Sequence, residues 1–150
     1  MLMDELINNY KSARSVFIQA VDHFPVEKRT EALFGSWSLK DILAHITAWE
    51  KASVQKVNDI VVGKEPVWID NVEKFNEQTA KEKSPESWKN IYQEFIKTGE
   101  EMIKIYGDLP KELWDKQAGP NPKFTPRRFL EAETSHYKGD HLTQVRQFLL

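Results

Sequence analysis

The chain has 150 residues, no cysteine and a net charge of −2, and 40% of its residues are hydrophobic. This composition predicts one packed domain over residues 1–150 and excludes disorder, disulfides and thiolate metal sites. Both signs of charge are interspersed and no apolar run approaches about 20 residues, so we expect neither nucleic-acid binding nor a membrane span. A cytoplasmic protein whose partner is a small molecule is the expectation.

Apolar residues that recur three and four positions apart predict a first helix over residues 2–23. The same pattern predicts a second helix over residues 39–61. Ser38 is placed as its N-cap and Asp41 as the capping-box partner, which fixes where this helix starts. Residues 62–69, which include Gly63 and Pro66, are predicted to form a loop.

A weaker helical pattern runs from Trp68 to Ala80. A third helix is predicted to start with Ser84 as N-cap and a proline at the first helical position, and to end at Gly107. Thr125-Pro126 repeats the cap-plus-proline pattern and predicts a fourth helix that continues to near the C-terminus. No segment alternates as a strand does, so the sequence predicts an all-α four-helix bundle with a long connection between helices two and three.

His45 lies within the apolar face of the second predicted helix, where it is either a satisfied core residue or a ligand or catalyst lining a cavity. In the fourth predicted helix Tyr137 and His141 are four residues apart, so both are expected to face inward. His136 is five residues from His141, or about 140° around an α-helix. His136 is therefore placed at the helix edge, in contact with Asp140.

Glu50 follows His45 by five residues and falls at the boundary of the apolar face. It is either a solvated side chain or, if it turns inward, a general base that works with His45. Trp49 is expected in the core or in a cavity wall. His23 lies near the end of the first helix, where the helix dipole already explains a basic residue.

Several short motifs from both halves of the chain support one and the same family resemblance. They are Trp37-Ser38, Asp41, His45, Trp49-Glu50, Phe75-Asn76, Glu133-Thr134-Ser135 and the terminal His141-Leu142-Thr143-Gln144-Val145-Arg146. With these motifs the whole chain resembles the DinB-like superfamily of four-helix bundles, and Phe75-Asn76 and Glu133-Thr134-Ser135 are most similar to its ClbS/DfsB-type subgroup.

The resemblance implies a divalent metal, Zn²⁺ or Ni²⁺, held by a histidine of helix two and two ligands four residues apart in helix four. His45 matches the first position and His141 the last, but the remaining position is Tyr137. A neutral phenol is a poor ligand for these ions, so a third ligand is missing. His136 would join the site only if the helix were locally distorted. The subgroup is associated with hydrolysis of an electrophilic genotoxin.

Three functions follow as alternatives. In the first, His45, Tyr137, His141 and Glu50 line a cleft between helices two and four and catalyse hydrolysis of a small electrophile, or transfer of a thiol to it. In the second, the same cleft binds a small molecule without reaction. In the third, the inward histidines are structural and the function lies in the face of a homodimer.

Overall fold

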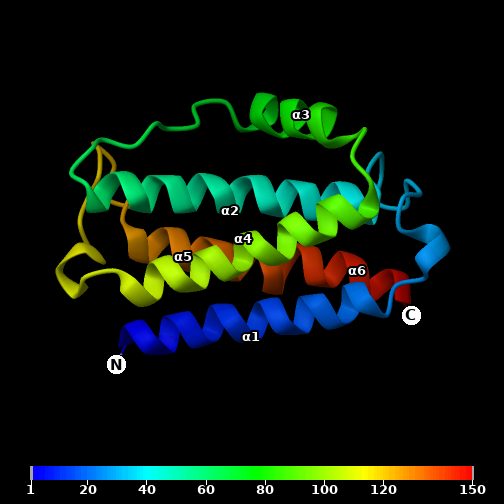
Figure 1. The fold of residues 1–150 in the computed structure, drawn as a ribbon, viewed down its shortest axis with the longest axis horizontal. Coiled ribbons are helices and arrows are strands. Elements are labelled where there is room, and N and C mark those ends of the chain that lie inside the picture. Colours follow the sequence, from blue (N-terminus) through cyan, green and yellow to red (C-terminus); the bar gives the residue numbers. More distant parts are fainter. Residues whose placement is uncertain (1, 150) are drawn as a thin grey trace.

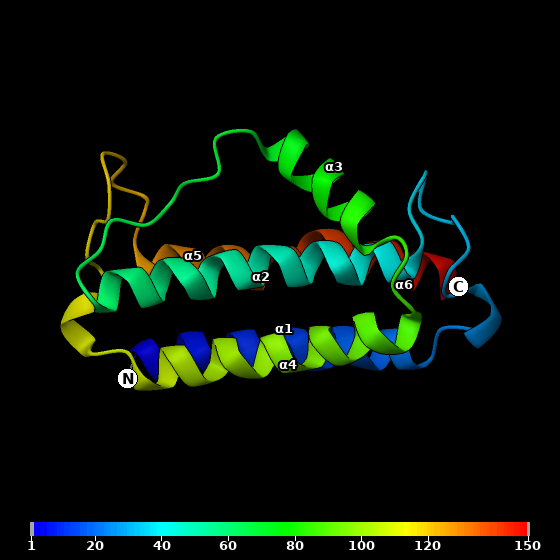
Figure 2. The same ribbon diagram turned by 45° about the horizontal axis from the view of Figure 1, so that its top comes forward.

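The computed structural model describes residues 2–149, which are helical apart from turns, loops and one isolated β-bridge between Phe34 and Trp37. The predicted all-α class is confirmed. Four long helical rods lie side by side (Figures 1 and 2). They are α1 (Leu2–Asp22), α2 (Leu39–Val61), α4 (Trp88–Asp108) and a last rod made of α5 (Pro126–Ser135), a π-helical segment (His136–His141) and α6 (Leu142–Leu149).

The rods enclose one hydrophobic core. α2 packs along α4, while α1 packs against α4 and against the whole of the last rod. Aromatic rings join the rods at the centre, where the Phe17 ring centroid lies 6.0 Å from that of Phe95 and 5.4 Å from that of Tyr137. Burying an aromatic or branched aliphatic side chain contributes roughly 1.5–3 kcal/mol, so this core supplies most of the stabilisation.

The start of α2 matches its prediction. The Ser38 side chain accepts a hydrogen bond from the Asp41 backbone N–H, and the Asp41 carboxylate accepts one from the Ser38 backbone N–H. Leu39, Ile42 and Leu43 follow at once and are fully buried. The capped end and the apolar face together fix the rotation of α2, and therefore the direction in which its polar residues project.

The start and end predicted for the third helix are wrong. Its N-cap is Ser87, three residues after the predicted Ser84, and the helix continues through Gly107 to Asp108. Ser84 instead closes the preceding helix, with its backbone N–H bonded to the carbonyl of Ala80. The Lys40 ammonium donates to the Ser84 and Glu86 carbonyls at 2.9 and 2.7 Å, which holds this connection against the start of α2.

α3 (Val72–Lys83) lies outside the four rods, over α2 (Figure 2). It replaces the weaker helix predicted from Trp68, because Asn71 caps its start and residues 64–70 before it have no regular secondary structure. α3 has no fully buried residue. Among residues 2–149, no helix combines the length and apolar character that crossing a bilayer requires.

Candidate metal centre

The last rod contains one turn of π-helix, His136–His141, in line with the α-helices on either side. Its N-terminal half was predicted correctly, because the Thr125 side chain caps α5 and Pro126 occupies the first turn. A π-turn uses i→i+5 hydrogen bonds in place of i→i+4 and holds one more residue than an α-turn. Residues five apart consequently project from the same side of the helix.

His136 and His141 therefore face the same way, with ring centroids 5.1 Å apart. The expectation that they diverge by about 140° is wrong, since it assumed α-helical geometry throughout. No hydrogen bond or ion pair between His136 and Asp140 is found in residues 2–149, since the π-helical segment His136–His141 replaces the α-helical geometry on which the predicted i,i+4 contact depended. The π-turn is the local distortion that admits His136 to the site.

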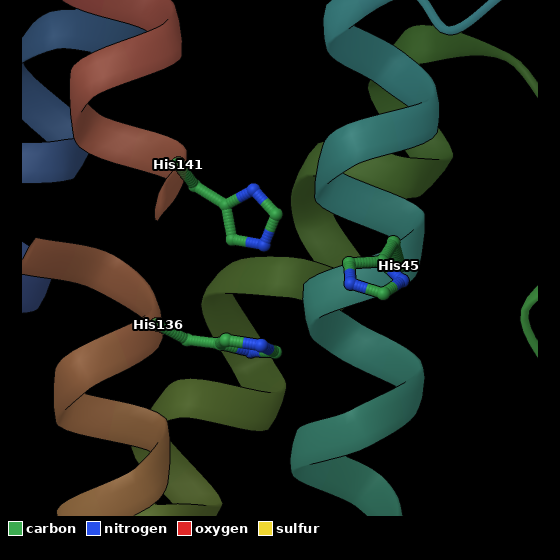
Figure 3. Close-up of side chains that lie close together, drawn as sticks. All are labelled: His45, His136 and His141. Carbon is green, nitrogen blue, oxygen red and sulfur yellow. The ribbon is translucent and has the colours of Figure 1, made fainter. Parts of the chain in front are cut away.

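His45 meets these two residues from α2 (Figure 3). Its ring centroid lies 5.3 Å from that of His141 and 5.9 Å from that of His136. One nitrogen from each of the three rings lies within 4.8 Å of the other two, and residues 2–149 contain no other such group of three histidine or acidic side chains. We call His45, His136 and His141 the histidine cluster.

Hydrogen bonding at His141 leaves one ring nitrogen available to a ligand. Nδ1 lies 3.1 Å from the Gln144 side-chain oxygen, which can only accept, so Nδ1 carries the proton. Nε2 then has the lone pair, and it is buried without any hydrogen-bond partner. A buried polar atom without a partner costs about 1–3 kcal/mol, which makes this nitrogen a candidate position for a ligand.

The electrostatic environment favours neutral imidazoles. Burial, followed by the neighbouring His141 and His136 rings, lowers the pKa of His45 to about 4, against a smaller opposing effect of Asn76. Burial and His136 also lower the pKa of His141, although its bond to Gln144 opposes this. Metals bind the neutral ring, so these two histidines are in the required state at pH 7.

The three side chains fit a divalent metal. A catalytic zinc site has three protein ligands and an open position, with Zn–N distances of about 2.0–2.1 Å. Nitrogens that share a tetrahedral zinc ion lie about 3.4 Å apart, so the three ring nitrogens, which lie within 4.8 Å of one another, would have to approach by at most about 1.4 Å. His45 and His136 are half-buried, which leaves them room to adjust and leaves a side open to solvent.

Glu50 and Tyr137, the other two predicted site residues, are brought to each other and not to the open side of the histidine cluster. Glu50 is fully buried and accepts hydrogen bonds from the Tyr10 and Tyr137 hydroxyls, the latter at 2.9 Å. Burial raises the pKa of Glu50 to about 7, while both tyrosine hydrogen bonds lower it. We call Glu50, Tyr10 and Tyr137 the tyrosine–glutamate cluster.

A second carboxyl group, Glu133, is buried near this cluster. Ser53 donates a hydrogen bond to its Oε1 at 3.1 Å, whereas its Oε2 has no partner. Burial, followed by the charge of Glu50, raises the pKa of Glu133 to about 8. Glu133 is not among the three residues that could share a metal.

Other residues singled out in the sequence lie away from the cluster or beside it. His23 is exposed, with Nδ1 2.7 Å from the Gln19 carbonyl. Trp49 is half-buried against Phe75. Sequence reasoning missed His136 as a site residue. The signal that could have found it is its spacing from His141, which is five residues, one more than the four that separate ligands on one face of an α-helix.

Comparison of the chain with protein-family models, curated proteins and solved structures finds no match. The chemistry available to the histidine cluster therefore has to be inferred from its own geometry.

Proposed function

We propose that the chain is a DinB-like four-helix bundle, most similar to the ClbS/DfsB-type subgroup, whose histidine cluster holds one divalent cation. The proposal is supported by an all-helical fold in which one histidine comes from the second rod and two from the last. The observation that carries it is the buried, unpartnered Nε2 of His141, with the rings of His45 and His136 beside it.

The ligand set favours Zn²⁺ or Ni²⁺. Imidazole nitrogen suits Zn²⁺, Ni²⁺, Cu²⁺ and iron, whereas Mg²⁺ and Ca²⁺ require oxygen ligands. A tetrahedral ion with three imidazole ligands keeps one position for an exchangeable group, and Zn²⁺ adopts this arrangement most readily. The second-sphere contact from Gln144 to His141 is of the kind that orients metal-binding histidines.

The activity we propose is attack on a small electrophile in the cytoplasm, as a hydrolase or a thiol transferase. When bound, the ion would lower the pKa of a coordinated water or thiol and so supply a nucleophile at neutral pH. The chain's own residues hold the three nitrogens in place. The Trp37 ring, whose centroid lies 4.9 Å from that of His45, offers an apolar wall at the half-buried side of the cluster.

In this proposal Glu50 and Tyr137 stabilise the fold and do not contact the metal or the substrate. Both are fully buried, and each uses its polar atoms on the other or on Tyr10. A proton held there has no exposed route to a substrate, so Glu50 is not the general base in this proposal; a bound ion would instead lower the pKa of the nucleophile itself.

Non-catalytic binding is the second candidate, and a cavity favours it. A cavity of about 280 Å³ lies where α2, α3 and α4 meet, with Ala44, Ala48 and Phe75 among its apolar lining. Its volume is near the lower end for small-molecule sites, which run from about 300 Å³. Lys51 and Glu94, which form an ion pair, lie at the same cavity.

The proposal is tested by titrating metal-free protein with Zn²⁺. We expect one ion per chain, and we expect His45→Ala, His136→Ala and His141→Ala each to weaken binding at least about 100-fold, the loss of one of three ligands. His23→Ala, a histidine outside the cluster, is the matched control and should bind like the unmodified protein.

Zn²⁺-loaded protein is then assayed with reactive epoxides and cyclopropanes. Turnover that is lost in the three cluster variants and kept in His23→Ala supports the enzyme. Zn²⁺ binding without turnover of any electrophile would favour a binding protein. Equal Zn²⁺ affinity in all five proteins would contradict the metal site itself.

A further inference from the structure

The cavity of about 280 Å³ between α2, α3 and α4 is lined on the α2 side by small residues. Ala44, Thr47 and Ala48 are three and four positions apart, so they lie on one face of α2, which we call the small-residue face. Phe75 is the one large apolar side chain that α3 contributes to the lining. Small side chains on this face leave space that a leucine or isoleucine would fill.

The size of the cavity suits a small apolar molecule. Ile91 of α4, which is fully buried, completes the apolar part of the lining. An apolar cavity of about 150 Å³ already holds a benzene molecule. The cavity under α3, with about 280 Å³, therefore has room for a phenyl ring that carries a short chain.

The charged side chains at this cavity include more donors than their partner can accept. The Glu94 carboxylate forms ion pairs with the ammonium groups of Lys51 and Lys83, the latter at 3.3 Å. Each ammonium has three N–H donors, whereas the carboxylate has about four lone-pair sites for both. Glu82 also lines the cavity, but it is exposed and accepts from Gln78 at 3.1 Å, and within residues 2–149 it pairs with neither lysine.

Two positive groups thus share one negative group beside an apolar space. All three side chains are partly exposed, and exposed ion pairs are weak, so another carboxylate can replace Glu94 at one of the lysines. We infer that the cavity binds a small monocarboxylate, with its apolar body on the small-residue face and its carboxylate at Lys51 and Lys83. The inference rests on the second candidate function, to which it assigns a ligand class, and it does not depend on the metal.

A ligand in this cavity should also hold α3 in place. α3 has no fully buried residue, and it contacts α2 through Trp49, which donates to the Asn76 side-chain oxygen at 2.8 Å and packs on Phe75 with ring centroids 4.7 Å apart. Phe75 and Thr79 of α3 line the cavity, so a bound ligand adds contacts to this helix. Ligand binding should therefore slow hydrogen exchange of the backbone amides of residues 72–83.

Three molecules that share one apolar body test the ligand class. They are phenylpropionate, phenylpropanamide and phenylpropylamine, which are negative, neutral and positive at pH 7. In calorimetric titrations of metal-free protein we expect phenylpropionate to bind at least about 10-fold more tightly than the amide, and the amine to bind most weakly. His45→Ala should bind phenylpropionate like the unmodified protein, because the histidine cluster lies outside this cavity.

Two variants that break the same ion pair distinguish ligand binding from a structural role. Lys51→Gln removes an ammonium and should weaken phenylpropionate binding about 10-fold, to the level of the amide. Glu94→Gln removes the competing carboxylate and should strengthen it. If the ion pair only maintained the structure, both variants would weaken binding. Lys81→Gln is the matched control, since Lys81 is an exposed lysine of α3 outside the cavity lining.

Ala48→Leu fills the cavity and should abolish binding of phenylpropionate. It should also remove the slower exchange of residues 72–83 in the presence of this ligand. Leucine forms helices almost as well as alanine, and the added side chain enters space that is open in the unmodified protein, so the variant should fold. The two ion-pair variants test the inference independently of this substitution.

The inference is overturned if millimolar phenylpropionate does not bind, or if folded Ala48→Leu binds it as tightly as the unmodified protein. Equal or tighter binding of the amide or the amine would keep a binding cavity and overturn its ligand class. None of these results affects the histidine cluster, which Zn²⁺ titration tests separately. If the protein binds phenylpropionate but no Zn²⁺, the metal proposal fails and the ligand class of the cavity stands.

Discussion

The two polar clusters between α2 and the last rod differ in how their hydrogen bonds are satisfied. In the tyrosine–glutamate cluster each carboxylate oxygen of Glu50 accepts a tyrosine hydroxyl, and all three residues are almost fully buried. In the histidine cluster the buried Nε2 of His141 has no partner, and His45 and His136 are half-buried.

The contrast separates two uses of buried polar groups. A satisfied network stabilises a particular packing of the rods, whereas an unsatisfied atom lowers stability unless a ligand completes it. The first cluster should therefore contribute to folding and the second to metal binding. Changes at Glu50 and Glu133 should therefore alter stability, whereas changes at Gln144 and Gly139 should act on metal binding.

Glu50→Ala should have the largest effect. It removes the acceptor of two buried hydroxyls and leaves a cavity, so the free energy of unfolding should fall by about 3–5 kcal/mol. Urea denaturation measures this. Zn²⁺ affinity of the folded fraction should change less than about threefold, because the two clusters share no hydrogen-bond partner. A 100-fold loss of Zn²⁺ affinity would instead place Glu50 in the metal site.

Glu133→Gln should make the protein more stable, in a way that depends on pH. The pKa of Glu133 is raised from 4.5 to about 8, so between these values the folded state holds a proton that the unfolded state has released. Stability is then fully present below about pH 4.5 and falls as the pH rises towards 8. Glutamine removes this dependence and should add roughly 2–3 kcal/mol at pH 7.

Urea denaturation of both proteins at pH 4, 5.5, 7 and 8 checks this result. The unmodified protein and Glu133→Gln should be close in stability at pH 4 and should diverge steadily above it. An advantage of the variant that stays constant with pH would contradict the assignment of a buried neutral carboxyl at this position.

Gln144→Ala should weaken Zn²⁺ binding about 10-fold, because it removes the oxygen that fixes the His141 tautomer. The effect is placed at the low end of the usual range since Gln144 is exposed and water can replace it. Competition with a chelator of known affinity measures the change. Gln144→Glu keeps the acceptor and should bind like the unmodified protein; equal affinity of Gln144→Ala would remove Gln144 from the site.

Deletion of Gly139 should have the smallest effect on the metal. Removing one residue turns the π-turn into an α-turn, which leaves the two histidines four residues apart and still on one face. Zn²⁺ affinity should stay within about 10-fold of the unmodified value. Gly139→Ala is the length-preserving control, because a Cβ at this position meets no atom within 4 Å. Loss of Zn²⁺ binding in a folded deletion variant would contradict this account of the π-turn.

Much of the fold follows from short-range sequence signals. Ser38 and Asp41 satisfy each other within one turn, and Thr125 does the same for α5, so both starts were predictable. Ser84 carries an equally good local signal, yet α4 starts at Ser87. Ser87 caps α4 through its own side chain, and the Lys40 ammonium of α2 binds two carbonyls of this connection, a long-range contact that no local pattern contains.

The site was predictable in part. His45 and His141 were placed inward by α-helical periodicity, and the structure brings their rings to 5.3 Å. His136 was not, since counting about 100° per residue fails when one turn is π-helical. The separation of Glu50 and Tyr137 from the histidines depends on the Tyr10 hydroxyl, which α1 supplies from a distant part of the chain.

The number of imidazole nitrogens around bound Zn²⁺ tests the central claim most directly, and X-ray absorption of the Zn²⁺-loaded protein measures it. The π-turn predicts three imidazole ligands in the unmodified protein and two in His136→Ala. Two imidazoles in both proteins would contradict the claim, because His136 would then lie beside the ion without binding it.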